Sequence, residues 1–149
     1  MRAVIQRVAR ASVSVEGNIV GQIESGLMVL VGAAEGDSEA DAKALALKVA
    51  TLRIFPDTGG KMNLDVQQAG GRILAISQFT LLGDCRKGRR PSFVKAGRPE
   101  PAKLRYDEYV RETRALGLHV ETGVFQADMQ VELINDGPVT LLLDTEKTF

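Results

Sequence analysis

The sequence predicts an α+β domain with an antiparallel or mixed β-sheet and two main helices packed outside it. Segments with strand patterns outnumber segments with helix patterns, and short turns join at least three pairs of predicted strands. The chain has 149 residues, of which 44% are hydrophobic, enough to bury one substantial core. We therefore expect residues 1–149 to form a single domain.

The first part of the chain is expected to form a meander of strands. Residues 3–8 alternate apolar and polar side chains, as a half-buried strand does. Residues 12–15 and 19–23 are predicted to form a hairpin that turns at Gly17-Asn18. Residues 27–32 are continuously apolar over the length of one strand, so we expect a central strand covered on both faces.

The first predicted helix follows Asp37 or Ser38, either of which is a competent N-cap. Apolar residues recur there at helical spacing, and the charged residues lie largely outside their stripe. This stripe consists of Ala42, Leu45, Ala46, Val49 and Leu52. After the helix, residues 53–55 are predicted to form a short strand that ends at a turn over residues 56–60. The polar residues 61–69 are predicted to be loop.

A second apolar strand pattern covers residues 73–76. A long loop over residues 83–99 follows, with six cationic side chains and a single carboxylate. The second helix is expected to begin at Pro99 or Pro101, because proline suits the first turn of a helix, and to end at Gly117. Its predicted apolar face consists of Ala102, Tyr106, Tyr109, Val110 and Leu116.

The C-terminal part is predicted to add three strands, over residues 118–121, 129–134 and 139–143. A turn at Asn135-Asp136-Gly137-Pro138 is expected to join the last two strands. A plain turn with a trans proline is the default for such a sequence. Its position between two good strands is unusual, because a glycine-proline turn exposes its carbonyl oxygens with little side-chain cover.

Composition excludes several classes of protein and site. Lys plus Arg and Asp plus Glu both number 19, so the whole chain has no net charge to attract a polyanion. The single cysteine, Cys85, rules out an intramolecular disulfide and a cysteine-rich zinc site, and it fits a reducing compartment, so we expect a cytoplasmic protein. The alternating N-terminus does not resemble a signal peptide, and no apolar run approaches the roughly 20 residues that span a bilayer, so no membrane association is expected.

Conventional catalytic groups are scarce in the sequence. His119 is the only histidine, and strand alternation turns it away from the face of Leu118 and Val120, which favours a solvent-facing or capping role. Cys85 has no placed base and no second cysteine, so an incidental loop thiol is favoured. The carboxylates are scattered, and no phosphate-binding glycine motif follows a strand, so neither a metal nor a nucleotide cofactor is expected.

Two stretches remain as candidates for a functional site. The second apolar strand ends in Ser77-Gln78-Phe79-Thr80-Leu81, where each polar side chain taken out of water costs roughly 1–3 kcal/mol unless it finds a partner. The alternative is that Ser77 and Thr80 have no functional role and simply form hydrogen bonds to nearby backbone where the strand becomes a loop. The basic loop offers donors for phosphate and, in Phe93, an aromatic face for a base, although a solvated charge run also fits it. The donors are Arg86, Lys87, Arg89 and Arg90.

With these stretches in view, the sequence resembles the D-aminoacyl-tRNA deacylase family, whose members remove D-amino acids from tRNA. The two signatures of the family stand here as Ser77-Gln78-Phe79-Thr80-Leu81 and Asn135-Asp136-Gly137-Pro138-Val139-Thr140. Residues 1–8, 87–93 and 122–125 extend the resemblance over essentially the whole chain. One departure is Gln126, at a position where family members usually carry glycine.

The resemblance implies a barrel-like core of sheet and a homodimer whose active sites lie at the subunit interface. Gly137-Pro138 of one subunit, joined by a cis peptide and held by Arg7, would reach into the partner's pocket near Ser77, Gln78, Phe79 and Thr80. The 3′-terminal adenosine of the aminoacyl-tRNA would lie nearby. The residues implied to contact it are Phe125, Ala127 and Met129. Neither a metal nor an organic cofactor is implied.

An aminoacyl ester is already activated, so its hydrolysis needs a positioned water, an oxyanion donor and dry walls more than a strong nucleophile. We hypothesise that the ribose 2′-hydroxyl of the substrate assists the attack, while the backbone N–H groups around Phe79 and Thr80 stabilise the oxyanion. The carbonyls of Gly137 and Pro138 would exclude L side chains. The expected substrates are therefore D-aminoacyl-tRNA and glycyl-tRNA, including tRNA-Ala mischarged with glycine.

Two functions of other classes use the same residues. A non-catalytic RNA-binding module would contact RNA through residues 86–98 and would cleave no ester. A serine esterase would use Ser77 as a nucleophile on small esters and would need no RNA.

Overall fold

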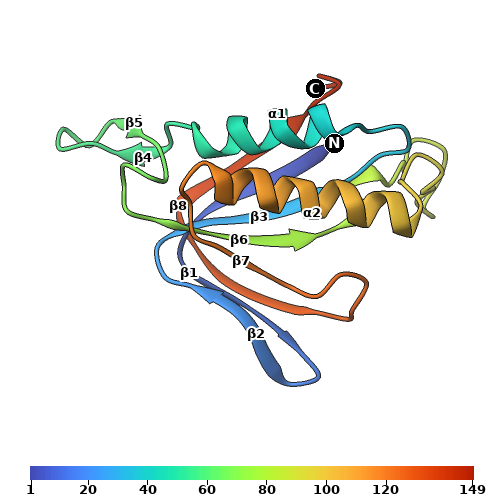
Figure 1. Cartoon of the computed structure of the whole chain (residues 1–149), viewed down its shortest axis with the longest axis horizontal. Helices are drawn as coiled ribbons and strands as arrows, with labels where there is room; N and C mark the ends of the chain where they lie inside the picture. The colour runs from blue at the N-terminus through green and yellow to red at the C-terminus, as the bar shows by residue number, and fades with distance from the viewer.

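The computed structural model describes all residues, 1–149, and folds them into a strongly curved β-sheet with two helices on one side (Figure 1). The helices are α1 (Glu39–Ala50) and α2 (Pro99–Ala115). The strands are β1 (Arg2–Val15), β2 (Asn18–Ile23), β3 (Gly26–Gly32), β4 (Phe55–Pro56), β5 (Met62–Leu64), β6 (Arg72–Ser77), β7 (Val120–Thr122) and β8 (Gln130–Asp144). A short 3₁₀ turn, η1 (Phe79–Leu82), follows β6. Neither helix combines the length and the apolar character that a membrane crossing requires.

The main sheet is mixed, as the sequence predicted. Its six strands follow the order β2-β1-β3-β6-β7, with β8 also paired to β1. The pairs β3–β6 and β6–β7 are parallel, and the pairs that β1 forms with β2, β3 and β8 are antiparallel. The strands β4 and β5 form a separate small sheet.

The sheet curls until its two ends nearly meet, which makes it barrel-like. Strand β2 curls away from the helices and approaches β7. At Gly21 in β2, an added Cβ would lie only 2.6 Å from the carbonyl oxygen of Thr122 in β7. A residue with any side chain would therefore hold the two ends of the sheet apart, and glycine permits the contact.

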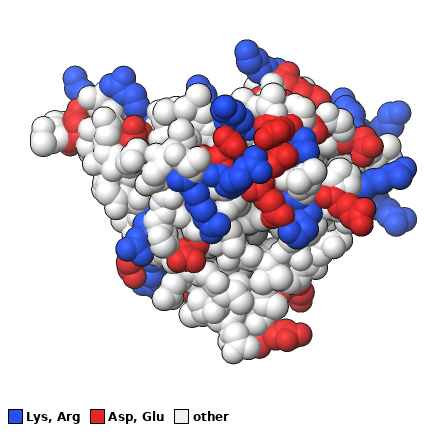
Figure 2. Space-filling model, in the orientation of Figure 1, with Lys and Arg blue, Asp and Glu red and all other residues white.

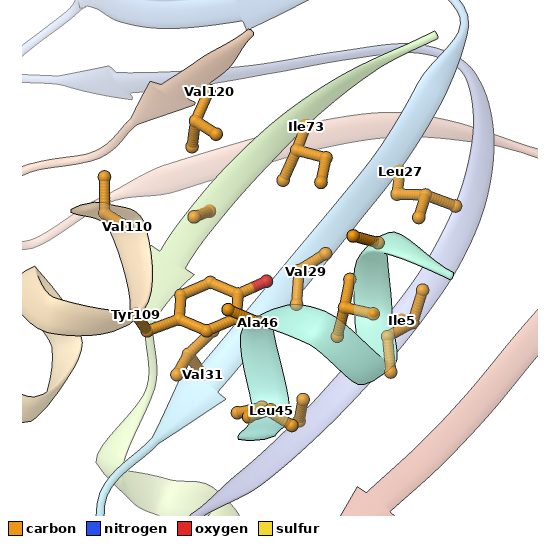
Figure 3. Close-up of a cluster of buried hydrophobic side chains, with 14 of the residues drawn as sticks. Ile5, Leu27, Val29, Val31, Leu45, Ala46, Ile73, Tyr109, Val110 and Val120 are labelled. Atoms are coloured by element: carbon orange, nitrogen blue, oxygen red, sulfur yellow. The ribbon is translucent and has the colours of Figure 1, made fainter. Parts of the chain in front are cut away.

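The curvature gives the protein two cores, one on each face of the sheet. In β3, Leu27, Val29 and Val31 face the helices, whereas Met28 belongs to a smaller cluster on the other face. Figure 3 shows the helix side, where these β3 side chains lie among residues of α1, α2 and β6. The continuous apolar run at residues 27–32 thus forms a central strand with both faces covered, as expected.

Both helices form where the sequence predicted them. Helix α1 has Ser38 as its N-cap, and Ser38 and Asp41 complete a reciprocal capping box. Helix α2 begins at Pro99, which needs no hydrogen-bond acceptor at that position. It ends before Gly117, whose φ of +88° is the left-handed conformation that glycine adopts readily after a helix.

Several predicted boundaries were wrong. Residues 2–15 form one long strand instead of two separate ones, and its hairpin with β2 turns at Glu16-Gly17, one residue earlier than expected. Both turn residues have positive φ, which suits a two-residue turn between twisted strands. The short strand predicted at residues 53–55 is β4, over Phe55–Pro56, and its partner β5 lies inside the segment predicted as loop.

The last two predicted strands are one strand, β8, interrupted by a bulge. Gln6 pairs with Thr140 and Val8 with Asn135, so Arg7 alone stands opposite the four residues 136–139. The predicted turn at Gly137-Pro138 is this bulge. It does not reverse the chain, because both halves of β8 stay paired to β1.

Candidate active site

A pocket of about 660 Å³ lies where the carboxyl end of β6 meets the N-terminal half of α2. It brings together Ser77, Gln78, Phe79, Phe125, Ala127 and Met129, all predicted from the sequence. Most of the lining residues are hydrophobic. The remaining lining residues, polar and apolar, are Val31, Ala33, Ile76, Phe93, Ala96, Gly97, Pro99, Ala102, Tyr106, Gln126, Asp128 and Val131. The polar end of β6 therefore opens into a largely apolar chamber.

The polar end of β6 is held against β3. The backbone N–H of Gln78 donates to the carbonyl of Val31 at 2.8 Å, which continues the pairing of the two strands beyond Ser77. A Cβ at Gly32 would lie 2.8 Å from the carbonyl oxygen of Gln78, so the absence of a side chain at Gly32 lets the segment come this close. Gly32 ends the apolar run at residues 27–32, but its contact with the end of β6 was not predicted from the sequence.

Two aromatic rings form one wall of the pocket. Phe79 is 56% exposed, which is unusual for so large an apolar side chain, and its ring meets that of Phe93 edge-to-face at 5.1 Å between centroids. Phe93 comes from the basic loop, so the loop and the end of β6 share this wall. Exposed aromatic faces in a pocket suit a planar ligand such as a nucleic-acid base.

The turn η1 leaves two backbone N–H groups without an acceptor inside the turn. Leu81 N–H bonds back to the carbonyl of Gln78 at 3.3 Å, and the side chain of Gln78 makes no cap to the turn. The N–H groups of Phe79 and Thr80 precede this bond and have no acceptor within the turn. Thr80 itself does not line the pocket, and its hydroxyl accepts a hydrogen bond from the amide of Gln78.

The segment 125–129 forms the opposite wall. Phe125 packs near Tyr106 of α2, with ring centroids 6.1 Å apart, and the hydroxyl of Tyr106 donates to the carbonyl of Ala75 at 2.9 Å. Burial raises the pKa of Tyr106, so this hydroxyl stays a proton donor. Tyr106 thus ties α2 to β6 just before Ser77. Tyr106 was predicted on the apolar face of a helix, and its place in the lining of the pocket could not be predicted from the sequence.

Gln126 stands in this wall in a left-handed conformation, with φ of +64°. Side chains other than glycine adopt this region at a cost of about 1 kcal/mol or more. The departure from glycine noted in the sequence therefore falls at a position where the backbone favours glycine.

The basic loop lies beside the pocket, at the right of Figure 1, and Figure 2 shows its cationic side chains extending from that edge. Arg86 is already paired, because its Nε and Nη2 contact the two carboxylate oxygens of Asp84 at 2.9 and 2.6 Å. The same interaction holds the pKa of Asp84 well below its usual range. Lys87, Arg89 and Arg90 are exposed and form no ion pair.

The Gly137-Pro138 corner lies elsewhere on the chain. Its peptide bond is cis, and both residues are exposed and outside the pocket. Arg7 donates from Nε to the carbonyl of Asp136 at 2.9 Å and from Nη1 to the carbonyl of Ile54 at 2.6 Å, so it ties the bulge to the segment between α1 and β4. Within one chain, therefore, the corner and the pocket do not meet.

Asn135 also shapes this bulge, through side-chain hydrogen bonds that were not predicted from the sequence. Its side-chain oxygen accepts from the N–H of Val139 at 2.8 Å, and its amide nitrogen donates to Thr140 Oγ1 at 2.9 Å. An asparagine before a glycine-proline pair is a turn signal that could have indicated this bonding.

The remaining candidates stay apart from the pocket. His119 is exposed and contacts Glu121 at 2.8 Å, in line with the expected solvent-facing role. Cys85 is an exposed loop thiol. No cluster of three or more His, Cys, Asp or Glu side chains occurs.

Solved structures with the same architecture define the fold class first. A structure described as the c-Myc DNA unwinding element binding protein matches with a TM-score of 0.92 and 38% identity, covering 97% of this chain and 99% of that one. A probable eukaryotic D-amino acid tRNA deacylase matches with a TM-score of 0.81 at 17% identity, covering 95% and 97%. The nearly closed sheet with two outer helices is thus the fold of D-aminoacyl-tRNA deacylases.

Sequence comparison then gives the family. The family model for D-Tyr-tRNA(Tyr) deacylase matches residues 4–144. The D-aminoacyl-tRNA deacylase of Koribacter versatilis (strain Ellin345) is 61% identical over 149 residues, which is the full length of both chains. The chain belongs to the D-Tyr-tRNA(Tyr) deacylase family and is a hydrolase, as its two signature segments suggested.

Proposed function

We propose that this protein hydrolyses the ester bond of D-aminoacyl-tRNA and releases a free D-amino acid and tRNA. The observation that carries this proposal is the pocket itself, in which the polar end of β6 opens into an apolar, aromatic chamber of about 660 Å³. A chamber of this size accommodates a nucleoside with an attached amino acid. Residues 1–149 act as one domain in this proposal, and the cytoplasm is the compartment we expect.

The terminal adenosine would lie in the chamber between the ring of Phe79 and the wall that contains Phe125, Ala127 and Met129. Phe79 offers an exposed aromatic ring to the base, and Met129 lines the same chamber. With the base held there, the ester carbonyl would lie near Ser77, Gln78 and the first residues of η1.

The reaction needs few protein groups. A water molecule adds its oxygen to the ester carbonyl carbon, the bond to the ribose 3′-oxygen breaks, and that oxygen takes up a proton. We expect the adjacent 2′-hydroxyl of the substrate to assist the attack and the N–H groups of Phe79 and Thr80 to bind the developing oxyanion. These two N–H groups have no acceptor within the turn, which supports their assignment as oxyanion donors.

Thr80 then has a positioning role through its hydrogen bond with Gln78. We expect Thr80→Ala to retain most of the hydrolysis of D-tyrosyl-tRNA, measured as single-turnover release of the amino acid. A loss of about four orders of magnitude, the scale of removing a member of a catalytic triad, would contradict this role and would indicate a nucleophile.

Selection of the D enantiomer would require a second subunit. The corner at Gly137-Pro138 is exposed and outside the pocket of its own chain, whereas its carbonyls could cover a partner's pocket. Strand β8 supports such an interface, because it pairs only with β1 and exposes Ile134 and Leu142. In that homodimer the carbonyls of Gly137 and Pro138 would collide with an L side chain and leave room for a D side chain.

Contact with the rest of the tRNA would come from the basic loop. Lys87, Arg89 and Arg90 project from it unpaired, which suits them to bind phosphates. Arg86 would contact phosphate as well, although its pairing with Asp84 gives it a part in holding the loop.

Deacylation of matched D- and L-aminoacyl-tRNA tests the central proposal. We expect D-tyrosyl-tRNA to be consumed, L-tyrosyl-tRNA to survive, and glycyl-tRNA(Ala) to be cleaved because glycine has no side chain to exclude. Binding of tRNA without ester cleavage would favour an RNA-binding module, and labelling of Ser77 by a fluorophosphonate would favour a serine esterase. Survival of glycyl-tRNA(Ala) beside rapid loss of D-tyrosyl-tRNA would contradict the exclusion mechanism.

Complementation tests whether the corner acts in the partner's site. Gly137→Val damages the corner and Phe79→Ala damages the pocket, so each homodimer should be inactive. Co-expressed subunits that mix at random should regain roughly a quarter of the wild-type sites, each formed by the intact pocket of one subunit and the intact corner of the other. Absence of any regain in dimers that contain both variants would contradict action across the interface.

A further inference from the structure

A second pocket of about 550 Å³ lies beside the first, between α2 and residues 122–125. Tyr106 and Phe125 line both pockets, so this pair of rings forms a wall that the two pockets share. The other lining residues are Lys103, Asp107, Val110, Arg111, Arg114, Thr122, Gly123 and Val124.

The second pocket has an excess of positive charge. Three cations line it against one carboxylate, Asp107, which pairs with Lys103. Arg111 contacts Glu39 and Glu112, whereas Arg114 has no carboxylate partner and donates from Nη2 to the carbonyl of Val120 at 2.8 Å. Figure 2 shows Lys and Arg side chains, with acidic side chains among them, on the face of the molecule where α2 lies in Figure 1. The charge of Arg114 is therefore available to an anion.

The other side of the second pocket is apolar. Val124 is 45% exposed, and its side chain joins Phe125 on the segment that leads from β7 to β8. Thr122 adds a hydroxyl that makes no hydrogen bond within the chain, whereas the N–H of the neighbouring Gly123 is committed to the carbonyl of Ala75. The pocket thus pairs an apolar surface with an unbonded hydroxyl and a guanidinium that has no carboxylate partner, a combination that fits a base and a phosphodiester.

We propose that the second pocket binds the nucleotide that precedes the terminal adenosine of the aminoacyl-tRNA, an inference that rests on the proposed function. The base of that nucleotide lies against Val124 and Phe125, and the phosphodiester that joins it to the adenosine faces Arg114. The two pockets share the rings of Tyr106 and Phe125, as adjacent sites for consecutive nucleotides of one strand must, and Arg114 supplies the positive charge that a phosphate needs.

The test compares two substrates that differ by one nucleotide. One is the 3′-D-tyrosyl ester of adenosine, and the other is the same ester of the dinucleotide cytidylyl-adenosine. The measured quantity is the ratio of kcat/KM for the dinucleotide ester to that for the adenosine ester. We expect a ratio of roughly ten or more in the unaltered protein, because a charge-assisted phosphate contact contributes at least that factor.

Two variants place this gain in the second pocket. Arg114→Gln removes the cation, and Val124→Glu places a carboxylate at an exposed position in the apolar surface against which the base is expected to lie. Each should lower the ratio at least about fivefold. Lys48→Gln, which removes an exposed charge at the end of α1, is the matched control and should keep the ratio.

The outcomes separate this inference from the proposed function. If the unaltered protein fails to hydrolyse either ester and also D-tyrosyl-tRNA, the proposed function itself is wrong. If it hydrolyses the adenosine ester with no gain from the added nucleotide, the second pocket is not a nucleotide site. A gain that survives in both Arg114→Gln and Val124→Glu overturns the assignment, because the nucleotide then binds elsewhere. Unfolding curves for both variants check that the fold is kept.

Discussion

The hydroxyl of Tyr109 has no hydrogen-bond partner, although it lies in the larger core with its side chain fully buried (Figure 3). Thr113, one turn further along α2, donates its own hydroxyl to the backbone carbonyl of Tyr109. Burial raises the pKa of Tyr109, so the hydroxyl remains neutral, and an unpaired buried hydroxyl costs about 1–3 kcal/mol.

We expect Tyr109→Phe to raise the free energy of unfolding by about 1 kcal/mol, since the change removes an unpaired polar atom and little volume. Tyr106→Phe is the matched control. Its hydroxyl bonds to the carbonyl of Ala75, so the same change there should lower the free energy of unfolding by about 1 kcal/mol. Urea titrations of both variants measure this, and equal effects would show that the Tyr109 hydroxyl has a partner.

Gln126 has a left-handed backbone, which only glycine adopts without strain. We expect Gln126→Gly to raise the free energy of unfolding by about 1 kcal/mol. Gln130→Gly, at the first residue of β8, provides the control and should lower it by about 0.5–1 kcal/mol, because glycine is unfavourable in a strand. Thermal unfolding of both proteins decides the point, and a loss of stability in Gln126→Gly would mean that the side chain makes compensating contacts.

At the scale of elements, the basic loop divides its cations into paired and unpaired ones. Arg86 is engaged with Asp84, whereas Arg89 and Arg90 are free. We expect Arg89→Gln and Arg90→Gln each to reduce the slope of log Kd against log salt for tRNA binding by about 0.7–0.9, the value for one lost phosphate contact.

Arg86→Gln should change that slope less, because the charge of Arg86 is already compensated by Asp84. Lys48→Gln on α1 should leave the slope unchanged. Filter binding over a series of salt concentrations measures all four variants. Equal slope changes for Arg86→Gln and Arg89→Gln would show that Arg86 leaves Asp84 when RNA binds.

Elements whose structure is set by residues close in the sequence could be predicted. Ser38 caps α1, Pro99 begins α2, and the apolar run at residues 27–32 forms the central strand, because caps and periodicity are local properties. The bulge at Gly137-Pro138 was taken for a turn, since the same residues serve both. Only the pairing of β8 with β1 on both sides, a property of distant residues, distinguishes them.

In the candidate site, too, local features could be predicted and features set by distant residues could not. Its strand end and the wall at Phe125–Met129 were predicted because their motifs are contiguous and resemble a family. Tyr106 and Gly32 could not be assigned to the pocket, because their roles arise from the distance between α2, β3 and β6 in space. The Gly137-Pro138 corner has a signature in the sequence, but its proposed place in a partner's pocket depends on a second chain.

At the scale of the whole molecule, the closure of the sheet depends on Gly21. A Cβ there would lie 2.6 Å from the carbonyl oxygen of Thr122, and backbone cannot yield as a flexible side chain can. We expect Gly21→Ala to lower the free energy of unfolding by about 1–3 kcal/mol, as overpacking does. Gly59→Ala should change it by less than about 0.5 kcal/mol, because its Cβ would meet only a side-chain oxygen of Asp57. Urea unfolding of the pair tests closure, and equal stability would show that the sheet can open at little cost.

The pairing of β1 with β8 joins the two extremes of the chain, with Arg2 opposite Asp144. During synthesis β1 emerges from the ribosome before the other strands. Its backbone hydrogen bonds to β8 can form only after β8, the last of these strands, has also emerged. Nascent chains stalled before β8 has emerged should therefore lack the protease resistance of the finished protein. We therefore also expect a nascent chain in which β8 has not yet paired with β1 to be unable to deacylate tRNA.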